Sequence, residues 1–301
     1  MSAVPATDLL DPIDHGSSTH APAKAGKKRL GLGRTGQYVL LFFFLIVILI
    51  PVYVLLVTSF KTDGESLQLT RAWNLPQHWS LDGWKHAWDM LSRPLLNTFL
   101  VVIPAVIISS VLGSLNGFVL SRWRFRGANL VFTLILFGMF IPYQAVIVPL
   151  TQLLNSLDLK SGIIKLILLH SVYGIPITTL IFRNYYESVP HELIEASRID
   201  GAGMMRTYWS VVLPISIPSF VVVLIWQFTS AWNDFLFALF YNTSKDSTVV
   251  TVALNNLASS QNPSYPSNMA GAVIASIPTL VVYILLGKYF VGGLMSGSVK
   301  G

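Results

Sequence analysis

Residues 188–203 read SVPHELIEASRIDGAG and lie between two long apolar runs. Pro190 suits the first turn of a helix, and Glu192 and Glu195 complement the positive end of a helix dipole. Gly201 can end the same helix, because glycine tolerates the turn that follows a helix. We therefore expect a short surface helix within an organised loop.

The expected helix has a narrow apolar stripe formed by Leu193, Ala196 and Ile199, at three-residue spacing. The small side chains of Ala196 and Ser197 would let another surface approach closely. The same periodicity is equally typical of an amphipathic helix that lies on lipid headgroups. Periodicity alone leaves both interpretations open.

The chain around this segment has the composition of an integral membrane protein. Apolar residues make up 53% of its 301 residues, charged residues only 11%, and the mean hydropathy is +0.61. A membrane helix needs about 20 apolar residues. Six runs of roughly that length occur: Tyr38–Ser59, Leu95–Leu120, Leu130–Thr151, Ile163–Phe182, Ile217–Tyr241 and Met269–Val291. The sequence predicts an all-α fold with six transmembrane helices, in which prolines such as Pro142 and Pro176 cause kinks or breaks.

Basic residues orient these helices, because short loops rich in Lys and Arg stay in the cytoplasm. They gather in three segments: Lys24 to Arg34, Arg122 to Arg126, and Arg183 to Arg206. Both termini are therefore expected inside (N-in/C-in). The net charge of +6 lies beside helix ends, so it indicates membrane topology and no nucleic-acid partner.

Two domains are expected: a disordered cytoplasmic tail, residues 1–37, and a membrane domain, residues 38–301. The membrane domain would include the loop at about residues 185–216 and a cytoplasmic tail at 292–301. The sequence has no G-x-x-x-x-G-K-[ST] phosphate loop, so ATP hydrolysis would come from another polypeptide. It has no serine-hydrolase elbow, no H-E-x-x-H and no clustered metal ligands, so we expect neither catalytic nor metal residues.

Three short elements in the loop carry a family resemblance. Glu195-Ala196-Ser197, Asp200-Gly201-Ala202 and Leu213-Pro214 resemble the E-A-A, D-G-A and L-P elements of bacterial ABC-importer permeases. The resemblance implies that the short helix docks in a cleft of a cytoplasmic ATPase subunit, with Glu195 in a polar contact and Gly201 at the sharp turn. The implied coupling residues are Glu192, Glu195, Ala196, Ser197, Asp200, Gly201, Ala202, Leu213 and Pro214. Ser197 departs from the usual alanine, but it is small enough for docking to survive.

Other runs are similar to the carbohydrate-uptake branch, whose maltose-type member has six helices. They are Leu120–Gly127, Trp232–Leu239 and Gly293–Gly301. By resemblance, the C-terminal tail reaches into the ATPase dimer interface through Ser296, Gly297 and Lys300. Residues 252–257 and 286–291 look most similar to glucose and mannose permeases.

The resemblance implies an alternating-access sugar importer in the bacterial cell membrane. Its partners would be a second permease, two ATPase subunits and an extracellular or lipid-anchored sugar-binding protein. ATP and Mg²⁺ would bind the ATPase, and this chain would bind no cofactor. Glucose or mannose is the expected substrate, and a disaccharide, an oligosaccharide or glycerol phosphate is the alternative.

A sugar route needs hydrogen-bonding groups and aromatic faces. The candidates are Asn116, Tyr143, Gln144, Tyr173, Gln227, Trp232 and Asn233. Each could instead join helices or anchor the membrane interface. Asp234 is an acid within an apolar run, so a stand-alone proton-coupled transporter is a competing hypothesis. A local capping role is favoured for Asp234. His170 is expected to be packed against other side chains. A membrane-anchored scaffold is the third class.

Overall fold

The computed structural model describes residues 32–123, 125–242, 244–260 and 263–296, and it divides the chain into two compact units, residues 1–50 and 51–301. The described part of the first unit is helical. Helix α1 (Leu32–Ser59) begins there and ends in the second unit. It starts before the expected boundary at residue 37, and its side chains from Arg34 to Ile50 are exposed, as lipid-facing side chains should be.

The second unit consists of helices and turns in the described residues. Its elements are α2 (Asp63–Ser66), the 3₁₀ turn η1 (Leu69–Arg71), α3 (Asp82–Arg122), α4 (Ala128–Phe137), η2 (Gly138–Phe140), α5 (Ile147–Ser156), α6 (Gly162–Ser188), α7 (His191–Ile199), α8 (Met204–Thr207), the π-helical turn η3 (Tyr208–Val212), α9 (Leu213–Ile215), α10 (Ile217–Trp232), α11 (Leu236–Tyr241), η4 (Lys245–Ser247), α12 (Val250–Ala258) and α13 (Tyr265–Ser296). The all-α prediction is confirmed.

Four described helices, α1, α3, α6 and α13, are long and apolar enough to cross a membrane. A fifth span is formed if Met204–Ile215 and α10, which meet at a bend of 77°, count as one. The expected third run, Leu130–Thr151, is not continuous: it divides into α4, η2 and α5. The chain becomes extended at Ile141, because Pro142 disfavours the helical conformation of the residue before it.

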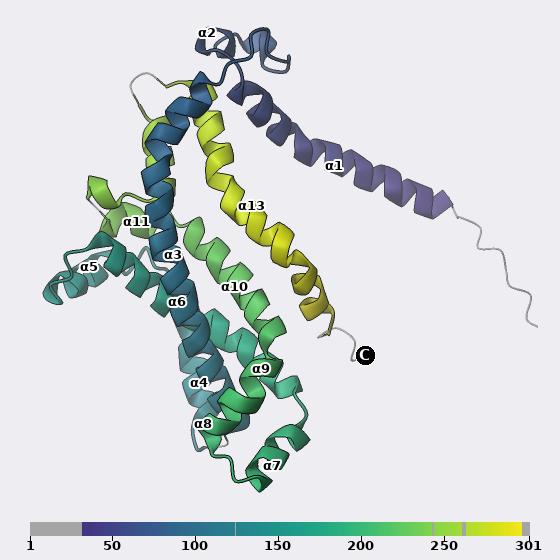
Figure 1. Cartoon of the computed structure of the whole chain (residues 1–301), viewed down its shortest axis with the longest axis vertical. Helices are drawn as coiled ribbons and strands as arrows, with labels where there is room; N and C mark the ends of the chain where they lie inside the picture. The colour runs from purple at the N-terminus through teal and green to yellow at the C-terminus, as the bar shows by residue number, and fades with distance from the viewer. Residues whose placement is uncertain (1–31, 124, 243, 261–262, 297–301) are drawn as a thin grey trace, which may run out of the picture. The chain divides into compact units, whose positions relative to one another are not determined.

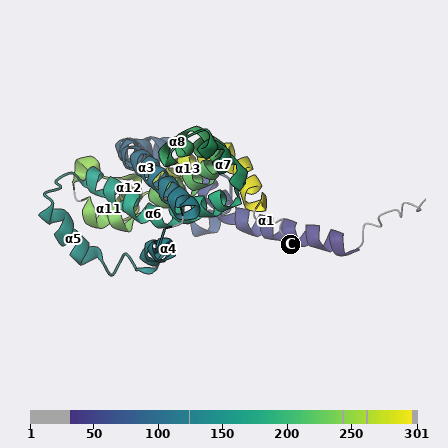
Figure 2. The same ribbon diagram turned by 90° about the horizontal axis from the view of Figure 1, so that it is seen from below.

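Helices α3 and α6 pack closely along their length and form the centre of the second unit (Figure 1). A Cβ atom added to Gly113 would lie 2.1 Å from Oγ1 of Thr178, and one added to Gly117 would lie 2.8 Å from the Arg183 nitrogen. The G-x-x-x-G pair therefore lets the two backbones approach, as in other membrane helix pairs. Helices α10 and α13 pack against α3, and Figure 2 shows α4 and α5 to one side.

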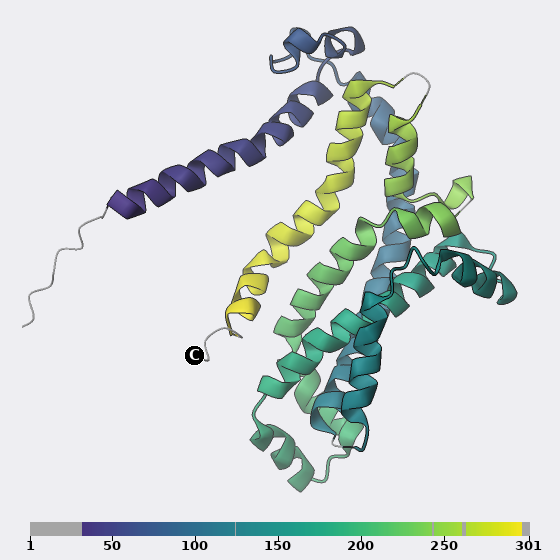
Figure 3. The ribbon, with the colours of Figure 1, turned by 180° about the vertical axis from the view of Figure 1, so that it is seen from behind.

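The two ends of this bundle differ in the loops they carry. Ser264 bonds Asp63 at 2.6 Å, so the loops before α3 and before α13 meet at one end. At the opposite end, Arg122 donates to the Val189 carbonyl, and α7 lies there (Figure 3). Arg122 and the basic segment at 183–206 therefore share one end, as their predicted cytoplasmic placement requires.

Candidate functional site

Helix α7 is the surface helix expected from the sequence, and both of its ends are defined. Pro190 is the residue before its first turn, with φ −56° and ψ 136°. Gly201 follows it in the left-handed region, with φ +77°. The Ala202 N–H donates to the Ser197 carbonyl at 2.9 Å and the Gly201 N–H to that of Arg198 at 3.0 Å. These two bonds form a Schellman motif, which explains the need for glycine at position 201.

One face of α7 packs against the protein and the opposite face is open. Ile194 and Ser197 are buried, and Ile194 belongs to a core cluster with Phe118 and Tyr186. The predicted stripe points outward instead: Leu193 is 44% and Ile199 85% exposed, and Ala196 is exposed as well. An apolar stripe left uncovered next to a rigid inner face suits contact with another surface.

Most of the predicted coupling residues lie on the outer surface. Glu192, Glu195, Ala196, Asp200, Gly201 and Pro214 are exposed, while Ala202 and Leu213 are half-buried. Ser197 differs from the expectation that it faces a partner. Its hydroxyl is buried, donates to the Ile194 carbonyl at 2.8 Å and lies 3.0 Å from Oγ1 of Thr207. The departure from alanine thus adds an inward contact between α7 and α8.

Arg122 holds this segment to the end of α3. Its guanidinium donates to the carbonyls of Tyr186 and Val189, and Nη1 lies 3.0 Å from Nδ1 of His191. The guanidinium of Arg198 lies 5.1 Å from the ring centroid of Trp123, which adds a cation–π contact. In the sequence, Arg122 is a topology signal and part of the Leu120–Gly127 run that resembles carbohydrate permeases. Its position in the last turn of a long helix was the available sign of a capping role.

A cavity of about 490 Å³ lies farther along α6, between α10, α11 and the turn after α4. Tyr143, Tyr173, Gln227 and Asn233, all predicted, line it, together with Trp226. The rings of Tyr143 and Tyr173 both lie against Phe237, with centroids 5.2 and 5.1 Å away. The cavity thus combines aromatic faces with amide groups.

Three predicted pathway residues do not line this cavity. Asn116 lies half-buried near the C-terminal end of α3, and Gln144 is exposed. Trp232 is 2% exposed and donates from Nε1 to the Ala275 carbonyl at 3.0 Å, so it joins α10 to α13. These contacts support a role for Trp232 in joining helices and not in the sugar route.

The ionisable groups near the cavity have local partners. The Asp234 carboxylate accepts from the backbone nitrogens of Phe237 and Ala238, at 3.4 and 3.2 Å, and so begins α11. His170 is 7% exposed, and its Nε2 lies 3.6 Å from Asp234. The capping role expected for Asp234 and the packed state of His170 are confirmed. In the part of the chain that the structure describes, no group of three or more His, Cys, Asp or Glu residues could hold a metal ion.

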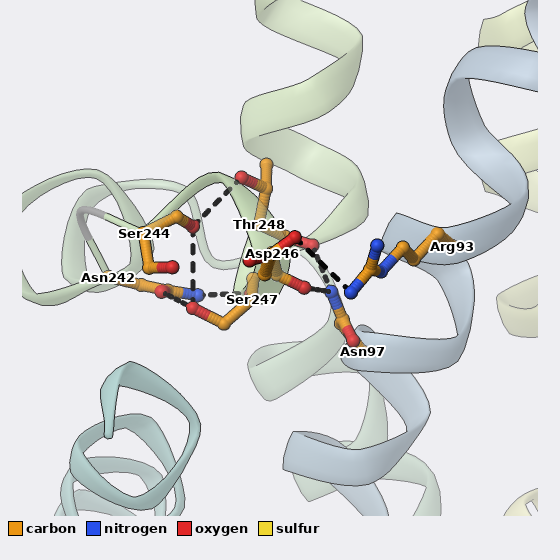
Figure 4. Close-up of polar contacts among 7 residues, drawn as sticks. All are labelled: Arg93, Asn97, Asn242, Ser244, Asp246, Ser247 and Thr248. Atoms are coloured by element: carbon orange, nitrogen blue, oxygen red, sulfur yellow. Dashed lines mark hydrogen bonds and ion pairs between the residues drawn. The ribbon is translucent and has the colours of Figure 1, made fainter. Parts of the chain in front are cut away.

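A polar network fixes the loop that follows α11 (Figure 4). Asn97 of α3 donates to the carbonyls of Asp246 and Thr248, both at 2.9 Å. Arg93 pairs with Asp246 at 3.3 Å, and Asn242 bonds Ser247. Because α11 forms one wall of the cavity, this network positions that wall against α3.

The predicted C-terminal tail overlaps the end of α13. Gly297 and Lys300 lie outside the described residues. Ser296 is the last residue of α13, so this helix extends into the segment expected to be a tail from residue 292. The tail remains a prediction.

These features define an integral membrane protein with an internal cavity and an anchored surface helix, α7, at one end of its bundle. The chain belongs to the family described as binding-protein-dependent transport system inner membrane component, whose model matches residues 109–294. It is a sugar ABC-importer permease subunit of the cell membrane, not an enzyme, and ATP hydrolysis is done by a separate subunit.

Two relatives and one solved structure illustrate the relationship. A probable ABC transporter permease of Pyrococcus horikoshii is 41% identical, over 91% of this chain and 100% of the relative. A xylose/arabinose import permease of Haloferax volcanii is 34% identical, over 88% of this chain and 93% of its own. A bacterial ABC transporter involved in alginate import shares the fold, with a TM-score of 0.76, 22% identity, and coverage of 86% of this chain and 96% of that one.

Proposed function

We propose that this chain forms half of the translocation pathway of an ATP-driven importer that works by alternating access. Helix α7 docks on the cytoplasmic ATPase and carries its movement into the membrane helices. The observation that supports this most directly is the exposed stripe of Leu193, Ala196 and Ile199 on a helix whose other face is anchored. A helix that merely lay on lipid would not require the Schellman turn or the hydrogen bonds from Arg122 to the Tyr186 and Val189 carbonyls, which we call the Arg122 clamp.

The complete importer contains a second, similar permease, two ATPase subunits and an extracellular or lipid-anchored sugar-binding protein. The family's description as binding-protein-dependent supports the last of these partners. ATP and Mg²⁺ bind to the ATPase subunits. Glu192, Glu195, Asp200 and Gly201 of this chain form the rim of the docked surface, because all four are exposed around α7.

The proposed substrate is a monosaccharide such as glucose or mannose. A cavity of about 490 Å³ is in the range of small-molecule sites. Tyr143 and Tyr173 offer ring faces to a pyranose, and Gln227 and Asn233 offer amides to its hydroxyls. The xylose/arabinose name of a relative also favours a monosaccharide. A disaccharide, an oligosaccharide or glycerol phosphate is the alternative, which a labelled-sugar panel would separate.

Reconstitution tests the transport mechanism. The complete complex in liposomes should import sugar only with ATP on the cytoplasmic side and with the binding protein outside. Uptake by this chain alone, driven by a proton gradient, would identify a stand-alone transporter instead. Uptake that persists without this chain would identify a scaffold.

Two variants test the docking of α7. Glu195→Lys reverses an exposed charge on α7, and Gly201→Asp places a side chain where φ is +77°. Both should abolish co-purification of the ATPase and ATP-driven uptake. Asp89→Lys, an exposed charge reversal on α3 toward the opposite end of the bundle, is the matched control and should retain the ATPase. Retention of the ATPase by both α7 variants would contradict the proposal.

A further inference from the structure

Three hydroxyl groups from three separate elements meet where α3 packs against the loop at about residues 185–216, which we call the coupling segment. Oγ of Ser114 in α3 lies 2.6 Å from the hydroxyl of Tyr186 in α6 and 2.8 Å from that of Tyr208 in the π-helical turn. None of the three residues is more than 1% exposed. We call this group the hydroxyl cluster.

An apolar shell encloses the hydroxyl cluster. The Phe118 ring lies 6.2 Å from the Tyr186 ring and 5.5 Å from the Tyr208 ring, and Phe182 stacks on Tyr186 at 5.8 Å. A buried hydroxyl is costly without a hydrogen-bond partner, so the three groups stabilise one mutual arrangement over others. Displacement of any one element would break at least one of the two hydrogen bonds.

The cluster lies where the coupling segment joins the membrane helices. Ser197 of α7 contacts Thr207, the residue directly before Tyr208. Tyr208 in turn begins the π-helical turn that leads to the 77° bend before α10. π-Helical turns are rare and occur frequently at functional sites. A continuous set of contacts thus runs from α7 through Thr207 and Tyr208 to Ser114.

The other partner of Ser114, Tyr186, connects this path to the cavity. Tyr186 lies near the C-terminal end of α6, and the same helix contributes Tyr173, Gly174 and Ile177 to the cavity wall. Tyr185, its neighbour, donates to the Ile215 carbonyl at the bend. Helix α6 is therefore bonded to the coupling segment at one end and lines the cavity farther along.

We propose that Ser114, Tyr186 and Tyr208 are positioning residues that make the coupling segment, α3 and α6 move as one body, so that ATPase-driven displacement of α7 reaches the cavity. This inference rests on the proposed docking of α7. A role in stability alone would lower assembly and leave the efficiency of assembled transporters unchanged. If the hydroxyl cluster transmits the movement, loss of its hydrogen bonds would instead lower the amount of sugar transported per ATP hydrolysed.

The test uses the complete reconstituted complex with Ser114→Ala, Tyr186→Phe and Tyr208→Phe, which remove hydroxyls and preserve most of the packing. Each should retain the ATPase and its hydrolysis, while sugar transported per ATP falls roughly fivefold, the effect of losing one buried hydrogen bond. Ser109→Ala and Tyr53→Phe are the controls. The Ser109 hydroxyl donates to the Val106 carbonyl within its own helix turn, and the Tyr53 hydroxyl donates to the Trp73 carbonyl in the loop before α3.

The outcomes separate this inference from the docking proposal. If the wild-type chain does not bind the ATPase, the docking proposal fails. If the variants bind the ATPase and keep the wild-type ratio of sugar transported to ATP hydrolysed, only the proposed role of the hydroxyl cluster is overturned. The same conclusion follows if the control variants lower that ratio as much as the cluster variants do. If Ser114→Ala does not assemble, Tyr208→Phe decides, because it retains the ring against Phe118.

Discussion

The coupling segment and the cavity are both built on α6, but different interactions hold them in place. Around α7, the Schellman bonds and the Arg122 guanidinium engage backbone carbonyls, which every sequence possesses. Around the cavity, the wall depends on side chains from α6, α10 and α11 that meet only in the folded protein. The geometry of the first region therefore depends on few side chains, Gly201 and Arg122 among them, whereas the lining of the second can vary with the sugar. This difference suits a family in which the coupling segment is common to its members and the cavity lining differs with the substrate.

Substitution of Gly201 should have the largest effect. Gly201→Val forces a β-branched residue to φ +77°, at a cost of about 1–3 kcal/mol, and disrupts the turn that places Asp200 and Ala202. We expect uptake to fall at least about 100-fold, with loss of the ATPase from the purified complex. Gly203→Ala is the control, because no atom lies within 4 Å of its added Cβ and its φ is not positive. Equal uptake by the two variants would show that the turn is not needed for coupling.

Removal of the Arg122 clamp should have the next largest effect. Arg122→Gln loses charge-assisted hydrogen bonds to the Tyr186 and Val189 carbonyls, each worth about 1.5–3 kcal/mol. Amide hydrogen exchange over residues 188–203 should accelerate by at least about tenfold, and uptake should fall by a similar factor. Arg126→Gln changes an exposed arginine of the same loop and should alter neither. Unchanged exchange in Arg122→Gln would mean that Ile194 packing alone holds α7.

The cavity should respond differently, through apparent substrate affinity. Asn233→Ala removes an amide that lines the cavity, so KM for sugar should rise about 5- to 10-fold, with ATPase binding unchanged. Asn116→Ala, at a half-buried site outside the cavity, is the control and should keep the wild-type KM. A lower rate at saturating sugar with unchanged KM would place Asn233 in coupling and weaken the contrast between the two regions.

The same contrast explains which features could be predicted from the sequence. The membrane class, the short helix and the turn at Gly201 follow from local rules on apolar length, helix ends and backbone conformation. The third run resisted prediction because its hydropathy is continuous although Pro142 interrupts the backbone. Trp232 and Asn233 are adjacent candidates, yet Trp232 packs against α13 and Asn233 lines the cavity. Only tertiary packing distinguishes them.

The hydroxyl cluster was missed for a related reason. Ser114, Tyr186 and Tyr208 are separated by 72 and 94 residues from serine to each tyrosine, so no spacing pattern joins them. The G-x-x-x-G pair at Gly113 and Gly117 indicates that a helix approaches α3, but not which one. Knowledge that α6 is that helix would have placed Tyr186 near Ser114.

Substitution of Ser197 should have the smallest effect on uptake. At this position the chain has serine where the E-A-A element of ABC-importer permeases usually has alanine. Ser197→Ala restores that residue and removes the hydrogen bond to the Ile194 carbonyl and the contact with Thr207. Because the side chain faces inward, ATPase binding should be unchanged. Uptake should stay within about twofold of wild type, because Ile194 still packs α7 into the core cluster that contains Tyr186 and Tyr208. Ala196→Leu, one residue earlier on the exposed face, should instead block close approach and release the ATPase. If Ser197→Ala released the ATPase and Ala196→Leu did not, the docking face of α7 would be the opposite of the one proposed, and the anchored side would have to open before coupling.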